Sequence, residues 1–207
     1  MHNTDIKFGV FDNFMDQKIH ELIENEVGYV QLNPGWHSSI DRSLPNWHWH
    51  YSIFQDTAQL PSPTAAELTM LDAKHPYIMM LWKEIKKTVY NFYDYECNFT
   101  RAYINAHTYG IDGLAHRDEG DYTAIYYPLT KWNIEHEGGT CLYNETKTDV
   151  IHYNAYVPNR LFLFPAHSWH RAMPITRDCH RLRPVVVFKC VIDVNSSSYA
   201  KKYYGLR

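Results

Sequence analysis

The chain has 207 residues, a formal net charge of −3 and 21% charged residues, which are ordinary values for one soluble globular domain. A slightly acidic balance argues against the basic surface that holds a nucleic-acid backbone. No stretch approaches the ~18–20 apolar residues of a membrane span. We therefore expect neither a nucleic acid nor a membrane as a partner.

The cysteine and aromatic content narrows the class of protein further. The four cysteines include no C-x-x-C spacing, and the first residues, MHNTDIKFGVFDNF, lack the charged and then apolar regions of a signal peptide. We therefore expect a reduced, cytoplasmic protein. The 17 Tyr and 6 Trp favour a β-rich fold with a walled pocket, because flat rings pack well on pleated surfaces.

The first half of the chain predicts helices and one long loop. Residues 16–28 predict an amphipathic helix, and residues 28–32 a short strand. Residues 33–65 are rich in Pro, Ser, Trp and His and predict an irregular loop, of a length that often covers a functional site. Residues 75–93 predict the clearest helix, with Pro76 in its first turn and a buried stripe of Ile78, Leu81, Ile85, Val89 and Phe92.

From about residue 97 the pattern changes to short β-branched and aromatic runs separated by Gly, Pro, Asn and Asp. These runs predict an antiparallel barrel or sandwich with the N-terminal helices packed on its outside. We expect one domain over 1–207, with a helical and lid-forming part at 1–96, a β core at 97–192 and a tail at 193–207. The predicted strands are FTRAYINAH, YTAIYYPL, GTCLYN, NRLFLFP and RPVVVFKCVID.

Two short motifs together predict a metal site. His116 and Asp118 flank Arg117, and in a strand residues i and i+2 point to one face, so an imidazole and a carboxylate would aim at one point. The later segment FPAHSWHRAMP offers a third ligand, His167 or His170. Two histidines and one carboxylate form the facial triad of non-heme Fe(II) oxygenases, which leaves three coordination positions open.

From Arg101 to Lys189 the sequence resembles the Fe(II)/2-oxoglutarate-dependent dioxygenase superfamily, in particular its prolyl 4-hydroxylase-like branch. The resemblance rests on HRD, TAIYYPL, GGT, PNRLFLFP, SWHRAMP and RLRPVVVFK in the family's order. It implies a mainly β fold with N-terminal helices, around a double-stranded β-helix (jelly-roll, cupin-like) core. It also implies that His116, Asp118 and His170 are the Fe(II) ligands, because the residues that follow His170 fit the family pattern better than those after His167.

The resemblance further implies that 2-oxoglutarate chelates the metal and leaves its far carboxylate inside the barrel. A buried carboxylate needs a charged partner, and a guanidinium is the best one. Arg181 and Arg183 are both available, and the family pattern favours Arg183. Val185 shares its face and stands where the family often has Ser or Thr. Tyr127 matches a tyrosine that binds the same carboxylate in relatives, and an ordinary core tyrosine is its alternative role.

The reaction implied by the resemblance is hydroxylation of an unactivated C–H bond by O₂, with 2-oxoglutarate converted to succinate and CO₂ and with ascorbate as a further reductant. A prolyl residue in a peptide or protein is the first expected substrate, and a free amino acid or other small molecule is the alternative. A metal-binding barrel without catalysis is a third hypothesis. It is weakened because structural zinc usually has four ligands, often Cys, and no cysteine joins this cluster.

The segment NWHWHY within the predicted loop also has two histidines at i, i+2 spacing. His48 and His50 are candidates for a second metal site. The alternative is an aromatic strand or lid over the pocket, in which Trp47 or Trp49 contacts the substrate.

Overall fold

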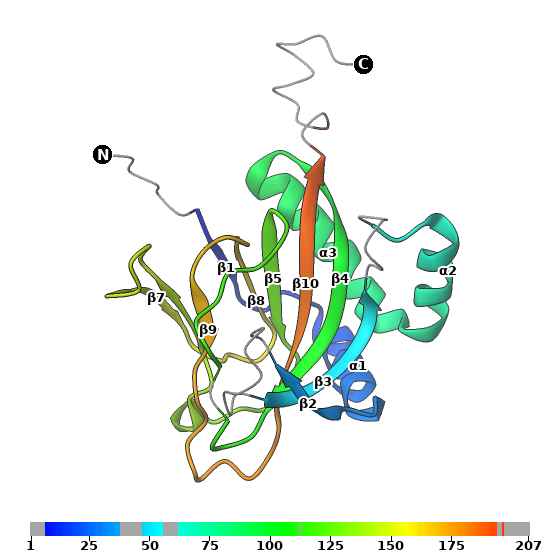
Figure 1. Cartoon of the computed structure of the whole chain (residues 1–207). Helices are drawn as coiled ribbons and strands as arrows, with labels where there is room; N and C mark the ends of the chain where they lie inside the picture. The colour runs from blue at the N-terminus through cyan, green and yellow to red at the C-terminus, as the bar shows by residue number, and fades with distance from the viewer. Residues whose placement is uncertain (1–6, 38–46, 56–61, 112, 194–195, 197–207) are drawn as a thin grey trace.

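The structure, a computed structural model, describes residues 7–37, 47–55, 62–111, 113–193 and 196. These residues form two antiparallel β-sheets and, on the outer side of the larger sheet, three α-helices that precede most of the strands (Figure 1). This arrangement confirms the predicted mainly β fold with N-terminal helices.

The helices begin and end where short polar side chains satisfy their backbone groups. The Asp16 carboxylate accepts from the backbone N–H of Lys18 at the start of α1 (Gln17–Tyr29). Thr64 and Glu67 form a capping box at the start of α2 (Ala65–Lys74). The Glu26 carboxylate of α1 accepts from the first backbone N–H groups of α3 (Pro76–Tyr93), so it caps that helix and fixes the two helices together.

The larger sheet has the strand order β1-β8-β5-β10-β4-β3-β2, and the smaller one β7-β6-β9. In the larger sheet, β10 and β4 form a long antiparallel pair from Arg183 opposite His107 to Asp193 opposite Glu96, with a register shift between Lys189 and Cys190. The strands are β1 (Gly9–Phe11), β2 (Asn33–His37), β3 (Trp47–Gln55), β4 (Glu96–His107), β5 (Tyr122–Tyr127), β6 (Thr140–Tyr143), β7 (Val150–Asn154), β8 (Arg160–Pro165), β9 (His170–Ala172) and β10 (Arg183–Asp193).

Alternation along the strands separates two apolar clusters. One lies between the helices and the larger sheet and includes the α3 stripe, in which Ile78, Leu81, Ile85 and Val89 are fully buried. The other lies between the two sheets and includes Tyr127, Val185 and Val187. The cavity described below opens on the second side, so the helices support the site from behind the sheet.

The structure corrects two predictions for the first half of the chain. Residues 28–32 are not a strand, because α1 continues to Tyr29 and Val30 caps it in an extended conformation. The predicted loop 33–65 contains β2, β3 and the first residue of α2. The two strands extend the larger sheet, because β3 pairs with β4 and β2 pairs with β3. Residues 38–46 and 56–61 of this segment lie outside the described part. The strands were missed because the Pro, Ser and Trp residues of this segment do not form a clear alternation of apolar and polar positions.

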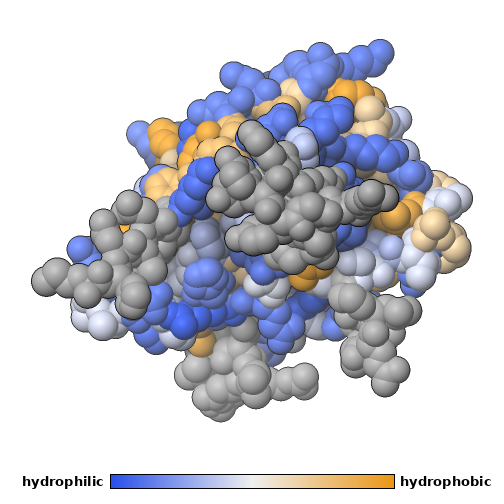
Figure 2. Space-filling model, turned by 90° about the horizontal axis from the view of Figure 1, so that it is seen from above, coloured by the Kyte–Doolittle hydropathy of each residue, from blue (hydrophilic) through white to orange (hydrophobic). Residues whose placement is uncertain are grey.

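The surface does not carry a membrane-spanning helix among the described residues. Figure 2 shows one face of the molecule, on which hydrophobic side chains form several patches separated by hydrophilic ones. The most exposed large apolar residues are Tyr29, Met70 and Ile134, which belong to different elements.

Candidate functional site

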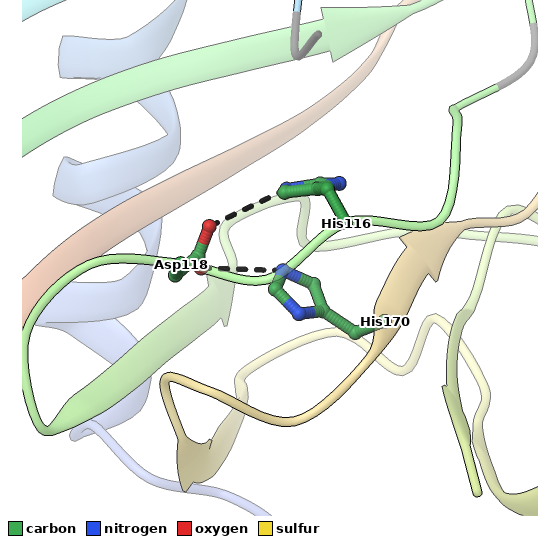
Figure 3. Close-up of side chains that lie close together, drawn as sticks. All are labelled: His116, Asp118 and His170. Carbon is green, nitrogen blue, oxygen red and sulfur yellow. Dashed lines mark ion pairs between the residues drawn. The ribbon is translucent and has the colours of Figure 1, made fainter. Parts of the chain in front are cut away.

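Three metal-donor side chains from two separated segments meet at the open side of the larger sheet. The imidazoles of His116 and His170 both point toward the carboxylate of Asp118 (Figure 3). Their Nε2 atoms lie 3.4 Å and 3.2 Å from the two carboxylate oxygens, and the candidate ligand atoms all lie within 4.8 Å of one another. The structure therefore brings together the three residues that the sequence selected.

Backbone hydrogen bonds, rather than one regular strand, hold the two segments in this position. His116 and His170 exchange both N–H···O bonds at 2.9 Å, and the backbone N–H of Asp118 donates to the carbonyl of Ala166 at 2.8 Å. His116 forms an isolated bridge, and Asp118 lies in the irregular segment between that bridge and β5. The premise of an i, i+2 strand pair is thus wrong in detail, although both side chains still reach the same point.

The two histidines are held in the tautomer that a metal requires. Nδ1 of His116 lies 2.8 Å from the carbonyl of Leu114, and Nδ1 of His170 lies 2.8 Å from the carbonyl of Ser168. A carbonyl only accepts, so each Nδ1 carries the proton and each Nε2 presents its lone pair to the site. Burial lowers the pKa of His170, against the opposing effect of Asp118, which favours the neutral ring.

The Asp118 carboxylate has two further partners on its second oxygen. Thr123 Oγ1 donates to Oδ2 at 2.6 Å, and the ammonium of Lys189 forms an ion pair with the same atom. Burial acts to raise the pKa of Asp118, but His170 and Lys189 lower it more, so this pKa lies well below its usual range. The carboxylate is therefore ionised and oriented before any ligand arrives.

A cavity of about 590 Å³ extends from this cluster along the larger sheet. Its floor consists of alternate residues of β10 and β4, which share one face of the sheet. The register places Arg183 opposite His107, Val187 opposite Tyr103, and Lys189 opposite Arg101. The floor is thus apolar and aromatic in the middle and cationic at both ends. The residues along it are Arg101, Tyr103, Asn105, His107, Arg183, Val185, Val187 and Lys189.

Arg183 is fully buried at the inner end of the cavity. Its Nε donates to the carbonyl of Gly138 at 2.5 Å and its Nη2 to that of Gly139 at 3.3 Å. Gly138 has φ 73°, and a Cβ there would lie 3.2 Å from Arg183 Cγ, while one at Gly139 would lie 2.5 Å from the carbonyl oxygen of Asn154. Gly138 therefore makes room for the arginine, and Gly139 allows the close approach of β7. Among the described residues no carboxylate forms an ion pair with Arg183.

Tyr127 lies beside Arg183, but its hydroxyl is already engaged. It lies 3.0 Å from the hydroxyl of Thr140 and accepts from Asn154 Nδ2 at 2.9 Å. Thr140 lines the cavity, and the Tyr127 ring centroid lies 5.7 Å from Arg183 Cζ. The role of Tyr127 in 2-oxoglutarate binding stays a prediction, and Val185 lines the cavity on the same face as Arg183.

The structure separates the alternatives that the sequence left open. His167 is exposed, whereas His170 contacts Asp118. Arg181 lies outside this cavity, half-exposed, with its guanidinium 3.8 Å from Glu24. The geometry therefore selects His170 and Arg183 as the residues that face the cavity.

The histidines of β3 do not join a group of three metal donors within the described residues. His50 Nδ1 donates to Oδ1 of Asn105 at 2.7 Å, and its ring stacks on Trp36 with ring centroids 4.2 Å apart, while His48 packs against His107. Trp36, on β2, lines the cavity in place of the tryptophans that we expected there, Trp47 and Trp49.

Two cationic residues of the site were missed. Lys189 and Arg101 bounded the region of resemblance but received no role. The alternation from Arg183 through Val185 and Val187 places Lys189 on the inward face, and this signal is present in the sequence alone. Alternation along β4 likewise places Arg101 on the face of Tyr103 and Asn105, but its position opposite Lys189 required the register of β4 on β10.

The donor set fits Fe(II). Two neutral imidazole nitrogens and one ionised carboxylate on one side of the site match the ligands that non-heme iron oxygenases use, and the remaining directions face the cavity. The buried guanidinium of Arg183, which has no carboxylate partner in the described part of the chain, lies in the same cavity and fits a carboxylate of a second ligand.

Comparison with known proteins supports the fold. No protein-family model matches the sequence, and no match was found among the curated proteins. A prolyl-4-hydroxylase from Pseudomonas putida matches with a TM-score of 0.61 and 12% identity, over 89% of this chain and 93% of that chain. An oxidoreductase of the 2OG-Fe(II) oxygenase family from Burkholderia pseudomallei matches with a TM-score of 0.64 and 10% identity, over 89% and 84%.

A third solved structure is HygX from Streptomyces hygroscopicus with nickel, 2-oxoglutarate and hygromycin B bound. It matches with a TM-score of 0.59 and 10% identity, over 90% of this chain and 83% of that chain. The chain thus has the double-stranded β-helix fold of the Fe(II)/2-oxoglutarate oxygenases, prolyl 4-hydroxylases among them, and carries their H-x-D…H triad.

Proposed function

We propose that the protein is an Fe(II)- and 2-oxoglutarate-dependent dioxygenase that hydroxylates a C–H bond. The observation that carries the proposal is the presence, in one cavity, of a two-histidine, one-aspartate cluster and of a fully buried guanidinium without a carboxylate partner in the described part of the chain. A metal-binding barrel without catalysis would not account for the buried guanidinium, because burying a cation without an anionic partner destabilises the folded state.

Each residue then has a defined task. His116, Asp118 and His170 would hold Fe(II), and Thr123 and Lys189 would fix the second oxygen of Asp118. Arg183 would anchor the far carboxylate of 2-oxoglutarate, and Thr140, Val185 and the Tyr127 hydroxyl would shape that end of the cavity. When bound, iron supplies the activation of O₂ that is coupled to decarboxylation of 2-oxoglutarate. Ascorbate would act only as an external reductant.

Two classes of substrate remain in the proposal. The fold similarity to prolyl 4-hydroxylases supports a prolyl residue of a peptide or protein. A cavity of about 590 Å³ is also of the size that holds a small molecule such as a free amino acid, and the fold similarity to HygX, solved with hygromycin B bound, supports this class. The single-domain organisation over 1–207 and a cytoplasmic location are part of the same proposal.

The test measures release of succinate from 2-oxoglutarate in the presence of Fe(II), O₂ and ascorbate. The wild-type protein should form succinate slowly alone and faster with one member of a panel of prolyl peptides and free amino acids. His116→Ala should lose both reactions while retaining its fold. A wild-type protein that neither binds 2-oxoglutarate in the presence of a divalent metal nor forms succinate would contradict the proposal.

A further inference from the structure

The cations that line the cavity differ in whether they have a partner. Lys189 pairs with Asp118, and Arg117, at the mouth, pairs with Glu145. Arg183 is assigned to 2-oxoglutarate by the proposed function. Arg101 is the remaining one, and within the described residues it forms no ion pair. The exposed Glu119, the second acidic residue of the lining, makes no ion pair with it either.

Arg101 is held in place without being neutralised. Its Cζ lies 5.3 Å from the ring centroid of Tyr103 and 5.9 Å from that of Trp36. Trp36 in turn stacks on His50 with an interplanar angle of 12°. These aromatic rings therefore hold the guanidinium by cation–π contacts that do not use its N–H donors, which remain for a ligand.

Two features indicate that this edge is made for an anion. Arg101 Nε is buried and has no hydrogen-bond partner, which is unfavourable unless a ligand supplies one. Arg101 also stands directly opposite Lys189 in the β4–β10 register, and like charges at such positions repel each other. Asp118 compensates Lys189, so one positive charge remains at this end of the cavity.

The position of Arg101 separates it from the 2-oxoglutarate anchor. Arg183 and Lys189 lie six residues apart on β10, which corresponds to about 20 Å along the strand. Asp118 contacts the Lys189 end, so a ligand at Arg101 would lie beside the metal cluster and on the side away from Arg183. This is the space left for the molecule to be oxidised.

Resting on the proposed function, we infer that the prime substrate carries a carboxylate group that binds Arg101, with Trp36 as the neighbouring wall. One uncompensated positive charge matches a carboxylate monoanion better than a phosphate, which carries about −1.5 to −2. The inference applies to an amino acid, to a peptide with a free C-terminus and to an acidic side chain alike, because the recognised group is the same.

The test uses pairs of ligands that differ by one charge. The protein is first loaded with 2-oxoglutarate and with Zn(II), which has no redox chemistry. It is then titrated with N-acetyl-L-proline and with N-acetyl-L-prolinamide. The corresponding glycine and glutamate pairs are tested in the same way. Calorimetry should show the acid binding about tenfold more tightly than the amide in at least one pair. The Arg101 Nε–H NMR signal, assigned by its loss in Arg101→Gln, should shift with the acid.

The variants decide whether Arg101 is responsible. Arg101→Gln should lose the preference for the acid, Arg101→Lys should retain part of it, and the matched control Arg117→Gln should retain it fully. Thermal unfolding checks the fold, and if Arg101→Gln does not fold, the Arg101→Lys preference and the wild-type NMR shift decide. Equal binding of acid and amide in every pair, or an unchanged preference in Arg101→Gln, would overturn the inference.

This outcome is separable from failure of the proposed function. If the wild-type protein does not bind Zn(II) and 2-oxoglutarate, the oxygenase proposal fails at the loading step. The Arg101 signal can still be titrated in the metal-free protein, where a shift by the acid and not by the amide supports the carboxylate site independently.

Discussion

The two ends of the cavity floor each carry an arginine, but the surroundings that stabilise its positive charge differ. At the inner end Arg183 is fully buried, and the carbonyls of Gly138 and Gly139 hold its guanidinium. At the outer end Arg101 is half-buried and held by aromatic faces, while Lys189 is paired with Asp118. The inner end thus encloses its cation, whereas the outer end leaves its cation partly exposed.

This difference indicates that the two ends of the cavity serve ligands of different kinds. A rigid, buried arginine suits a cosubstrate that never changes, since preorganisation reduces the cost of binding. A partly exposed arginine suits recognition of a particular prime substrate. Arg101 is such a residue, and it lies beside Trp36 of β2. The predictions below test whether the two ends, and the metal cluster between them, have separate functions.

The largest effect is expected from removal of a proposed metal ligand. His170→Ala should lower succinate release by about a thousandfold or more, because even supporting residues of metal sites contribute 10–100-fold. His167→Ala changes an exposed histidine three residues away and should leave Zn(II) binding unchanged. The measurement is calorimetric Zn(II) affinity together with succinate release. Equal loss in both variants would contradict the assignment of His170.

Arg183→Gln is expected to have the next largest effect. It should weaken 2-oxoglutarate binding by about a hundredfold, since removing one partner of a buried charge pair costs about 2–5 kcal/mol. Zn(II) affinity should change little, because Arg183 does not contact the metal cluster. Arg181→Gln is the matched control, since Arg181 pairs with Glu24 outside the cavity. If Arg181→Gln weakened 2-oxoglutarate binding instead, the two arginines would have to exchange roles.

Lys189→Met tests the link between the outer end and the metal cluster. Without metal it should lower the free energy of unfolding by about 3 kcal/mol, because it leaves the buried Asp118 carboxylate without its cation. With Zn(II) the loss should be smaller, since the metal compensates Asp118. Lys87→Met, at an exposed pair with Glu84, should change stability by less than about 0.5 kcal/mol. Denaturant unfolding with and without Zn(II) measures both variants.

The smallest effect concerns the dependence of stability on pH at the inner end. Burial, with Arg183 and His48 nearby, lowers the pKa of His107 well below its usual value of 6.5. The unfolded chain then binds more protons than the folded one below about pH 6.5, so stability falls as pH decreases, by up to about 1.4 kcal/mol per pH unit for this group. His107→Gln should flatten this slope in metal-free protein, and the exposed His167→Gln should not.

The sequence predicted the chemistry of the site because that chemistry is local. His116, Asp118, His170 and Arg183 each belong to a short motif next to a recognisable strand, and alternation fixes which face of β10 Arg183 occupies. The helices at 16–28 and 75–93 were equally predictable, since their apolar spacing and caps are local signals.

Strand order and register, in contrast, depend on the whole chain. The loop prediction for 33–65 failed because β3 is stabilised by pairing with β4, and β2 by pairing with β3, rather than by their own composition. The position of Arg101 directly opposite Lys189 follows from the same kind of long-range pairing, here of β4 with β10. The sequence by itself predicted which residues would form the candidate site. Only the tertiary structure decided which of them face each other, because contacts between distant strands are a property of their packing and not of any segment alone.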